Sequence, residues 1–370
     1  MAPVMEAKMA KIDEYRSEIE IIDRQMAELF EKRMKCAFNI AAYKRANGLP
    51  ILDVKREKAL IEKNSKYIQD DELIEYYQDY LVSVMQVSKQ YQRKQLEGVK
   101  VAYSGIEGSF ASLAVAKIMP DANRIPYKNF SEAYEAVVKG ECEFAVLPIE
   151  NSFAGEVGQV TDLLFQGDLT INGVYELKVS QCLLGVPGSR VDTIKTVISH
   201  PQALEQCNEY LTQHGITSIP FENTARAAKE VAEKNDINTG AIASRETAEL
   251  YGLTILDHDI NESAQNITRF AVLTRNREII RNNNDYTNFI LMFTVKNQAG
   301  TLAKAIAVMG EYGYSMRVLR SRPMKSKNWQ YYFYVEVEGN VEAAKDMIEA
   351  LENECELLKV VGTFKADMVL

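Results

Sequence analysis

Three polar motifs in the middle of the chain carry the side chains best suited to chemistry, and each lies at the end of an apolar run or beside one. They are Glu150-Asn151-Ser152, the stretch from Ser199 to Cys207, and Asn266-Ile267-Thr268-Arg269-Phe270. Together they offer carboxylate, amide, hydroxyl and guanidinium groups, which can bind a polar ligand. Because ligands of α/β sheets bind beyond the carboxyl ends of strands, we expect the motifs to converge on one crevice.

Each motif also has an ordinary structural explanation. Asn151 and Ser152 are common turn residues, Ser199 is a common N-cap, and Thr268 is a common strand residue. His200 is either a general acid or a packed histidine, and the second interpretation is favoured. Taken singly, these residues indicate structure, and only their combination indicates a site.

A second group of charged and amide side chains lies in the first hundred residues. The group comprises Arg16, Arg33, Lys44, Asp53, Arg56, Glu57, Ser88 and Gln92. Arg33 and Lys44 nearly share one helical face, as do Ser88 and Gln92 at i, i+4. The alternative is that these residues belong to a solvated helical face. Any one of the eight residues taken alone would favour this alternative.

Residues 1–96 are predicted to form an all-helical unit. The apolar positions Ile12, Tyr15, Ile19, Ile22, Met26 and Leu29 alternate three and four apart. Without Gly or Pro between residues 11 and 46, this helix extends about 50 Å, so its stripe needs a partner helix. We expect a dimer of such helices, with shorter helices over 54–66 and 71–95.

Residues 99–276 are predicted to alternate strands with helices. The expected strands cover 99–104, 144–149, 170–186, 194–199, 240–243 and 268–273. The expected helices cover 110–118, 131–139, 157–165, 202–213, 225–234 and 246–251. This alternation favours two α/β lobes, joined near Leu177 and Asn266, with a ligand cleft between them.

Beyond an Asn282-Asn283-Asn284 linker, residues 285–370 follow the order strand, helix, strand, strand, helix, strand. That order is typical of a ferredoxin-like α+β sandwich.

Composition excludes several classes of function. The 370 residues carry a net charge of −9, which argues against nucleic acid or an anionic membrane as the main partner. Five scattered cysteines show neither metal-ligand spacing nor a disulfide framework, as expected in a reducing compartment. Neither a signal peptide nor a membrane span is recognisable, so we expect a cytoplasmic protein.

The first segment resembles the helical chorismate mutases through Arg16, Glu31-Lys32-Arg33, Lys44, Asp53-x-x-Arg56-Glu57 and Ser88-x-x-x-Gln92. The resemblance implies a pericyclic rearrangement of chorismate to prephenate, which needs no nucleophile and relies on cations and amides. It implies that Arg16, Arg33 and Arg56 hold carboxylates, with Arg16 reaching the partner's site. It further implies that Lys44 and Gln92 stabilise the ether oxygen, that Asp53 and Glu57 hold the substrate hydroxyl and nearby cations, and that Ser88 contacts a carboxylate.

The middle segment resembles prephenate dehydratase from Val101-Ala102-Tyr103-x-Gly105 to the threonine motif. The resemblance implies a two-lobed, periplasmic-binding-protein-like fold and loss of carbon dioxide and hydroxide from prephenate, with neither metal nor organic cofactor. By this resemblance Thr268 assists the leaving hydroxyl, and Glu150, Asn151, Ser199 and Gln206 position it. Ser152 and Arg269 are the further substrate-binding candidates.

The last segment resembles an ACT regulatory domain, which implies phenylalanine as an effector at a dimer interface. Its effector-binding candidates are Ala299-Gly300-Thr301-Leu302 and Arg320-Ser321-Arg322-Pro323. The family usually has glutamate where Arg320 stands and leucine at Thr301, and the first exchange reverses the local charge.

We therefore expect a bifunctional enzyme of phenylalanine biosynthesis, converting chorismate to prephenate and then to phenylpyruvate. The expected partners are its two substrates and further copies of the chain, as a homodimer or a dimer of dimers. The competing hypothesis is a non-catalytic, amino-acid-responsive binding protein built on the same domains, which would bind prephenate without turnover.

Overall fold

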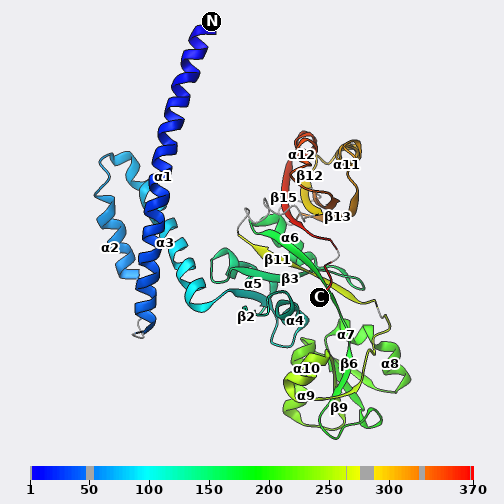
Figure 1. Ribbon diagram of the computed structural model, residues 1–370. Helices are drawn as coiled ribbons and strands as arrows, with labels where there is room; N and C mark the ends of the chain where they lie inside the picture. The colour runs from blue at the N-terminus through cyan, green and yellow to red at the C-terminus, as the bar shows by residue number, and fades with distance from the viewer. Residues whose placement is uncertain (1, 47–53, 264, 276–286, 325–329, 367) are drawn as a thin grey trace. The chain divides into compact units, whose positions relative to one another are not determined.

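The computed structural model describes residues 2–46, 54–263, 265–275, 287–324, 330–366 and 368–370 (Figure 1). The chain divides into two compact units, with the boundary between Gly98 and Val99. None of the helices in the described ranges has both the length and the apolar character that a membrane crossing requires.

The N-terminal unit is helical, as expected from its apolar periodicity. Its elements are α1 (Ala2–Ala46), α2 (Val54–Ser65), a short 3-10 helix (Asp71–Leu73) and α3 (Ile74–Glu97). The C-terminal half of α1 packs against α3, where Met34, Ala41, Leu81 and Met85 are buried.

The stripe on the N-terminal half of α1 remains uncovered by the described residues of this unit. The side chains of Ile12, Tyr15, Ile19, Ile22, Met26 and Leu29 are between 42% and 63% exposed. Exposed apolar surface of this extent is typical of an interface. The partner helix itself stays a prediction.

Within its described residues, the C-terminal unit contains two sheets. The ten-stranded sheet has the order β13-β14-β12-β15-β5-β11-β3-β1-β2, with β4 paired to β3. Its strands are β1 (Lys100–Ser104), β2 (Asn123–Tyr127), β3 (Phe144–Asn151), β4 (Gly155–Glu156), β5 (Thr170–Lys178), β11 (Ile267–Thr274), β12 (Asn288–Thr294), β13 (Met316–Pro323), β14 (Tyr331–Glu338) and β15 (Leu357–Phe364).

The five-stranded sheet has the order β10-β6-β9-β7-β8 and comes from residues between the two halves of the first sheet. Its strands are β6 (Cys182–Gly185), β7 (Thr196–Ser199), β8 (Thr217–Pro220), β9 (Thr239–Ala243) and β10 (Thr254–Asp257). The chain leaves the first sheet after β5 and returns at β11, where the Val179 N–H donates to the Asn266 carbonyl at 2.8 Å. These are the crossing points that the sequence predicted.

Helices cover both faces of each sheet (Figure 1). They are α4 (Phe110–Ile118), α5 (Phe130–Val138), α6 (Gly158–Gln166), α7 (Pro201–Gln206), α8 (Asn208–Gln213), α9 (Thr224–Lys234), α10 (Arg245–Tyr251), α11 (Thr301–Glu311) and α12 (Lys345–Glu352). The predicted helix over 202–213 is interrupted at Cys207, and the predicted strand over 170–186 is divided between the two sheets.

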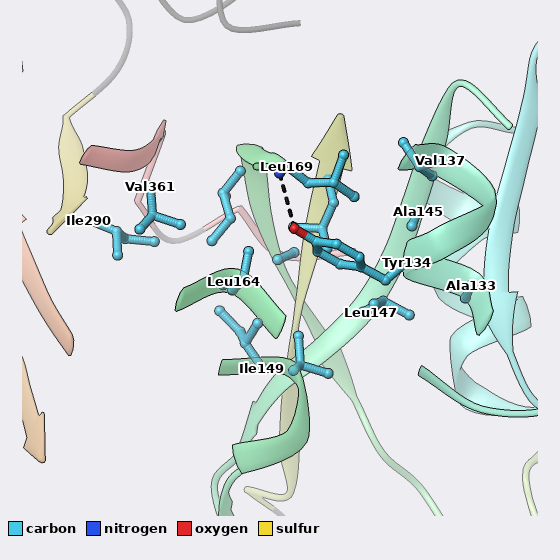
Figure 2. Packing of buried hydrophobic residues seen from close by; sticks show 14 of the residues in the cluster. Ala133, Tyr134, Val137, Ala145, Leu147, Ile149, Leu164, Leu169, Ile290 and Val361 are labelled. Atoms are coloured by element: carbon cyan, nitrogen blue, oxygen red, sulfur yellow. Dashed lines mark hydrogen bonds between the residues drawn. The ribbon is translucent and has the colours of Figure 1, made fainter. Parts of the chain in front are cut away.

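Strand β3 is buried on both faces, so its residues alternate between two cores. Ala145 and Leu147 face α5 and α6, whereas Val146 faces α4. Figure 2 shows the first of these cores, in which the Tyr134 hydroxyl accepts a hydrogen bond from the Leu169 N–H at 3.0 Å. This packing fixes β3 firmly up to the polar residues at its end.

The C-terminal segment has the predicted strand and helix order, and its antiparallel strands follow the ferredoxin-like sheet order. Its sheet is nevertheless continuous with the first one. At the junction Gly362 of β15 pairs with Ile171 of β5, and a Cβ atom added to Gly362 would lie 2.3 Å from the Ile171 carbonyl oxygen. Only glycine permits this approach of two backbones.

Candidate active sites

A cavity of 590 Å³ is lined by residues attached to both sheets of the C-terminal unit. From the first sheet come Ser104, Pro148, Asn151, Thr268 and Phe270. From the connection to the second sheet and its helices come Gln181, His200, Gln202, Gln206 and Asn223. Because Ser104 and His200 lie at the carboxyl ends of β1 and β7, the cavity occupies the position expected for a ligand in an α/β sheet.

Thr268 is held with its hydroxyl proton available to the cavity. Its Oγ1 accepts a hydrogen bond from Asn151 Nδ2 at 3.0 Å, and the two residues are paired across β11 and β3. The Thr268 hydroxyl donates no hydrogen bond to any of the described residues. A hydroxyl whose lone pair is engaged in this way is oriented as a donor toward a ligand.

Asn151 is itself fixed by hydrogen bonds on both ends of its amide. Its Oδ1 accepts from the N–H groups of Phe153 and Ala154 at 3.0 and 2.9 Å, and from Gln202 Nε2 at 3.3 Å. The two backbone donors determine which end of the amide is oxygen, so Nδ2 must face Thr268.

The polar wall continues to Gln206. Asn151 Nδ2 also donates to Asn266 Oδ1 at 2.8 Å, and Asn266 Nδ2 donates to Gln206 Oε1 at 2.9 Å. Gln181, 2% exposed, also lines the cavity, and no described residue donates a hydrogen bond to its Oε1. Because an unpaired buried amide oxygen is costly, Gln181 is a candidate for contact with a ligand.

Two cations and one carboxylate, Lys128, Arg226 and Glu222, line the cavity. Arg226 pairs with Glu222 at 3.1 Å on the exposed rim. The amino ends of α4 and α9 also face the cavity through their cap residues Ser109 and Asn223. Helix amino ends and cations favour anionic ligands.

His200 caps α7 and is neutral at pH 7. Its Nδ1 accepts from the Gln202 N–H at 3.3 Å, which places the proton on Nε2, and desolvation lowers the pKa of the ring. This supports the structural interpretation of His200, although the ring also lines the cavity.

A second polar cluster lies between α1 and α3 in the N-terminal unit. Arg33 Nη1 donates to the Ser88 hydroxyl, whose own proton goes to the Val84 carbonyl at 2.7 Å. One turn further along α3, Gln92 Nε2 donates to the Ala37 carbonyl at 2.8 Å. The structure therefore brings together three of the predicted side chains, from two helices that are distant in sequence.

The two segments match two sequence families. Residues 15–93 match Chorismate mutase type II, and residues 101–278 match Prephenate dehydratase. Arogenate dehydratase/prephenate dehydratase 2 of Arabidopsis thaliana chloroplasts is 35% identical over 283 residues, which are 74% of each chain. The bifunctional chorismate mutase/prephenate dehydratase of Aquifex aeolicus is 29% identical over 369 residues and covers 96% of this chain and 98% of its own. The chain belongs to the bifunctional chorismate mutase/prephenate dehydratase family.

Among solved structures, the C-terminal unit is similar to GqqA, described as a novel type of quorum quenching acylase. The TM-score is 0.67 with 30% identity, and the match covers 72% of this chain and 98% of that chain. This similarity supports the fold of the C-terminal unit.

In this family member neither Glu150 nor Arg269 lines the cavity, although both are adjacent in sequence to residues that do, Asn151 and Thr268. Successive strand residues point to opposite faces, so Arg269 points away from the side that carries Thr268. A β-bulge explains Glu150: Arg269 pairs with Glu150 but Phe270 pairs with Pro148, leaving Ile149 unpaired. The bulge turns Asn151 toward the cavity and Glu150 away from it.

Two predicted serines bind backbone rather than lining the cavity. The Ser152 hydroxyl donates to the Gln265 carbonyl at 2.9 Å, and it accepts from the Ile267 N–H at 2.9 Å. Ser199 is fully buried, and its hydroxyl donates to the Ile242 carbonyl at 2.6 Å. In this structure both hydroxyls join neighbouring segments of the backbone, and their expected roles toward a ligand stay predictions.

Of the remaining mutase candidates of the family pattern, Arg16 lies apart from the cluster between α1 and α3, and two others are not described. Arg16 is exposed and pairs with Asp13 at 3.2 Å, about 25 Å along the helix axis from Arg33 at 1.5 Å per residue. Lys44 is half-buried and Arg56 is exposed. Asp53 and the side chain of Glu57 lie outside the described residues.

The effector candidates occupy two places in the C-terminal segment. Gly300 follows Ala299 and caps the start of α11 with a φ of 86°. The Thr301 hydroxyl donates to the Lys296 carbonyl at 2.6 Å. Leu302 packs against the hydrophobic core of the segment. Ser321 and Pro323 are exposed on β13. Arg320 instead pairs with Glu150, and Arg322 pairs with Asp162. Both carboxylates belong to residues 99–276.

Sequence reasoning missed several cavity residues, among them Lys128, Gln181, Gln202, Asn223 and Arg226. Gln202 stood inside a recognised motif, and Asn223 carried an N-cap signal before a predicted helix. Lys128, Gln181 and Arg226 carried no local signal, because only the tertiary fold brings them to the cavity.

Proposed function

We propose that this chain catalyses two consecutive steps of phenylalanine biosynthesis in the cytoplasm. Residues 1–96 rearrange chorismate to prephenate, residues 99–276 convert prephenate to phenylpyruvate, and residues 285–370 respond to phenylalanine. The observation that carries the second activity is the Thr268 hydroxyl, which Asn151 orients as a donor into a cavity that Lys128 and Arg226 line.

The mutase step needs only a surface complementary to a dianion. In the rearrangement one carbon–oxygen bond breaks while one carbon–carbon bond forms, and no proton is transferred. Arg33, fixed by Ser88, is placed to hold a carboxylate, and Gln92 lies one helical turn away. Arg16 is too distant to act in the same site, so we assign it to the site of a second copy in a homodimer or a dimer of dimers.

The dehydratase step breaks two bonds and makes an aromatic ring. Electrons from the breaking carbon–carboxylate bond enter the ring and expel the C4 hydroxyl, giving carbon dioxide, hydroxide and phenylpyruvate. A threonine hydroxyl is too weak an acid to supply a full proton, so Thr268 acts as a hydrogen-bond donor to the departing oxygen. The released hydroxide then takes up a proton from the buffered solvent and becomes water.

The cavity supplies binding groups for the two substrate carboxylates. We assign this role to Lys128, Arg226 and the amino ends of α4 and α9, which provide positive potential without metal chemistry. Gln206, held by Asn266, and Gln181 contribute amides for the hydroxyl and keto oxygens.

The test uses the purified full-length chain with chorismate and then with prephenate alone. We expect phenylpyruvate from either substrate. Thr268→Val should lower dehydratase kcat by about 10²-fold or more and leave mutase turnover unchanged, because a donor to developing charge is lost. Thr268→Ser, which keeps the hydroxyl, is the matched control, and Arg33→Ala should remove mutase activity alone.

Binding of prephenate without turnover would reject the enzymatic proposal and favour the sensor hypothesis. Phenylpyruvate formation that Thr268→Val leaves unchanged would retain the activity but reject the role of Thr268. A phenylalanine titration of the dehydratase rate tests the regulatory assignment separately.

A further inference from the structure

Four charged side chains form a network on the face of β3 and β11 opposite the cavity. Arg269 donates from Nη1 to Glu150 at 2.9 Å and, through Nη1 and Nη2, to both carboxylate oxygens of Glu336 at 2.9 Å. Arg320 donates from Nη2 to the second oxygen of Glu150. The network thus joins two residues of the dehydratase strands to two residues of the C-terminal segment, with equal numbers of acids and bases.

The network is shielded from solvent. Glu336 is 1% exposed, Arg269 is 17% exposed, and Glu150 and Arg320 are each 22% exposed. Burial by itself lowers the pKa of Arg269, but hydrogen bonds and charge from Glu336 and Glu150 outweigh it and raise that pKa. Removing one member leaves a partly buried charge unpaired, which such networks tolerate poorly.

The network is one residue away from the groups that face the cavity. Arg269 follows Thr268 in β11, and Glu150 precedes Asn151 in β3. In the strand register Thr268 is directly opposite Asn151, and Arg269 is directly opposite Glu150. The bulge at Ile149 lies immediately next to Glu150. The position of the Glu150 carboxylate therefore bears on how the bulge presents Asn151, and through Asn151 on the orientation of Thr268.

Arg320 is the second cation that pairs with Glu150, after Arg269. The strand β13 alternates exposed and half-buried residues, so Arg320 faces the dehydratase strands while Arg317 faces outward. The guanidinium also lies over the Tyr334 ring, 6.0 Å from its centroid, and the Tyr334 hydroxyl donates to Glu336 at 2.7 Å. These contacts leave Arg320 engaged with the dehydratase strands rather than with a ligand of the C-terminal segment.

We propose that Arg320 is a positioning residue for the dehydratase reaction, acting from the C-terminal segment through Glu150 and the bulge on Asn151 and Thr268. This inference rests on the proposed dehydratase activity. It makes residues 285–370 a structural part of that site, in addition to any regulatory role.

A double-mutant cycle on the full-length protein tests the inference, with Arg320→Met, Glu150→Gln and their combination. We expect each single substitution to lower dehydratase kcat by about tenfold through misplacement of Thr268, with KM for prephenate changed by less than about twofold. The double variant should be no slower than the slower single variant, because both substitutions interrupt one path. Arg320→Lys should recover most of kcat, and mutase turnover should stay constant throughout.

Arg317→Met is the matched control, since Arg317 lies on the same strand, is 38% exposed and is 3.9 Å from Glu338. We expect it to retain wild-type kcat. If Arg320→Met does not fold, Glu150→Gln and Arg320→Lys still decide, because a near-isosteric Glu150→Gln with unchanged kcat overturns the inference.

The inference would also be overturned if the losses of kcat in the double variant were additive, or if the substitutions raised KM and left kcat unchanged. Wild-type protein that fails to consume prephenate would instead reject the proposed function. Wild-type turnover together with unchanged kcat in Arg320→Met would reject only the role of Arg320.

Discussion

At the scale of residues, one amide organises the dehydratase cavity. Asn151 receives backbone N–H groups on Oδ1 and donates from Nδ2 to Thr268 and Asn266. A carboxylate accepts but cannot donate, so this position distinguishes asparagine from aspartate more sharply than a turn residue would.

The first prediction is that Asn151→Asp lowers dehydratase kcat by about 10²-fold or more, because the Thr268 proton turns from the ligand toward the introduced carboxylate. Steady-state turnover of prephenate measures the change. Asn129→Asp is the control, because Asn129 caps the exposed start of α5 and aspartate caps equally well. A kcat within about threefold of wild type would contradict the role given to Asn151.

At the scale of elements, the bulge in β3 and the glycine contact between β15 and β5 determine which side chains meet. The bulge separates Asn151 from Glu150, and the contact at Gly362 joins the C-terminal strands to the first sheet. Both are backbone features, and neither can be replaced by side-chain packing.

The second prediction is that Gly362→Ala destabilises the C-terminal unit by about 1–3 kcal/mol, because the added methyl group meets the Ile171 backbone. Calorimetric unfolding, with loss of dehydratase activity marking the transition of that unit, provides the measurement. Gly310→Ala is the matched control: it lies in α11 with no atom within 4 Å of its added Cβ, so we expect equal or greater stability. Equal stability of Gly362→Ala and wild type would show that the junction is not close-packed.

At the scale of the whole molecule, the exposed stripe of α1 and the distance of Arg16 from Arg33 are the two features on which the predicted dimer rests. Burial of the exposed parts of six large apolar side chains would favour association, because full burial of such a side chain contributes about 1.5–3 kcal/mol. A dimer would also bring an Arg16 to each mutase cluster.

The third prediction is that Ile19→Glu produces monomers and removes most mutase activity while dehydratase kcat is retained, since the substitution buries an unpaired charge at the helix contact. Analytical ultracentrifugation and the two turnover assays measure these effects. Arg24→Glu, on the opposite side of α1 by helical phase, is the control and should remain dimeric. A monomeric wild-type protein with full mutase activity would refute the swapped arrangement.

The local sequence pattern was sufficient to predict most helices and strands and to recognise the family. The helical periodicity, the strand and helix alternation and the polar motifs all follow from side-chain spacing, which acts over a few residues. The unpredicted strands β2, β8 and β10 are edge strands of their sheets, where one neighbour is absent and alternating burial is weak. Gly362 carried no local signal either, since its partner is far away in sequence.

From the sequence alone we expected the three motifs that contain Asn151, Gln206 and Thr268 to converge on one crevice, because each lies beside a strand end in an alternating α/β pattern. Only the tertiary structure decided that Glu150 joins Arg269, because an unpaired Ile149 shifts the register by one residue. Only the tertiary structure supplied Arg320 as a partner for Glu150, since that contact requires two sheet segments, 170 residues apart, to meet.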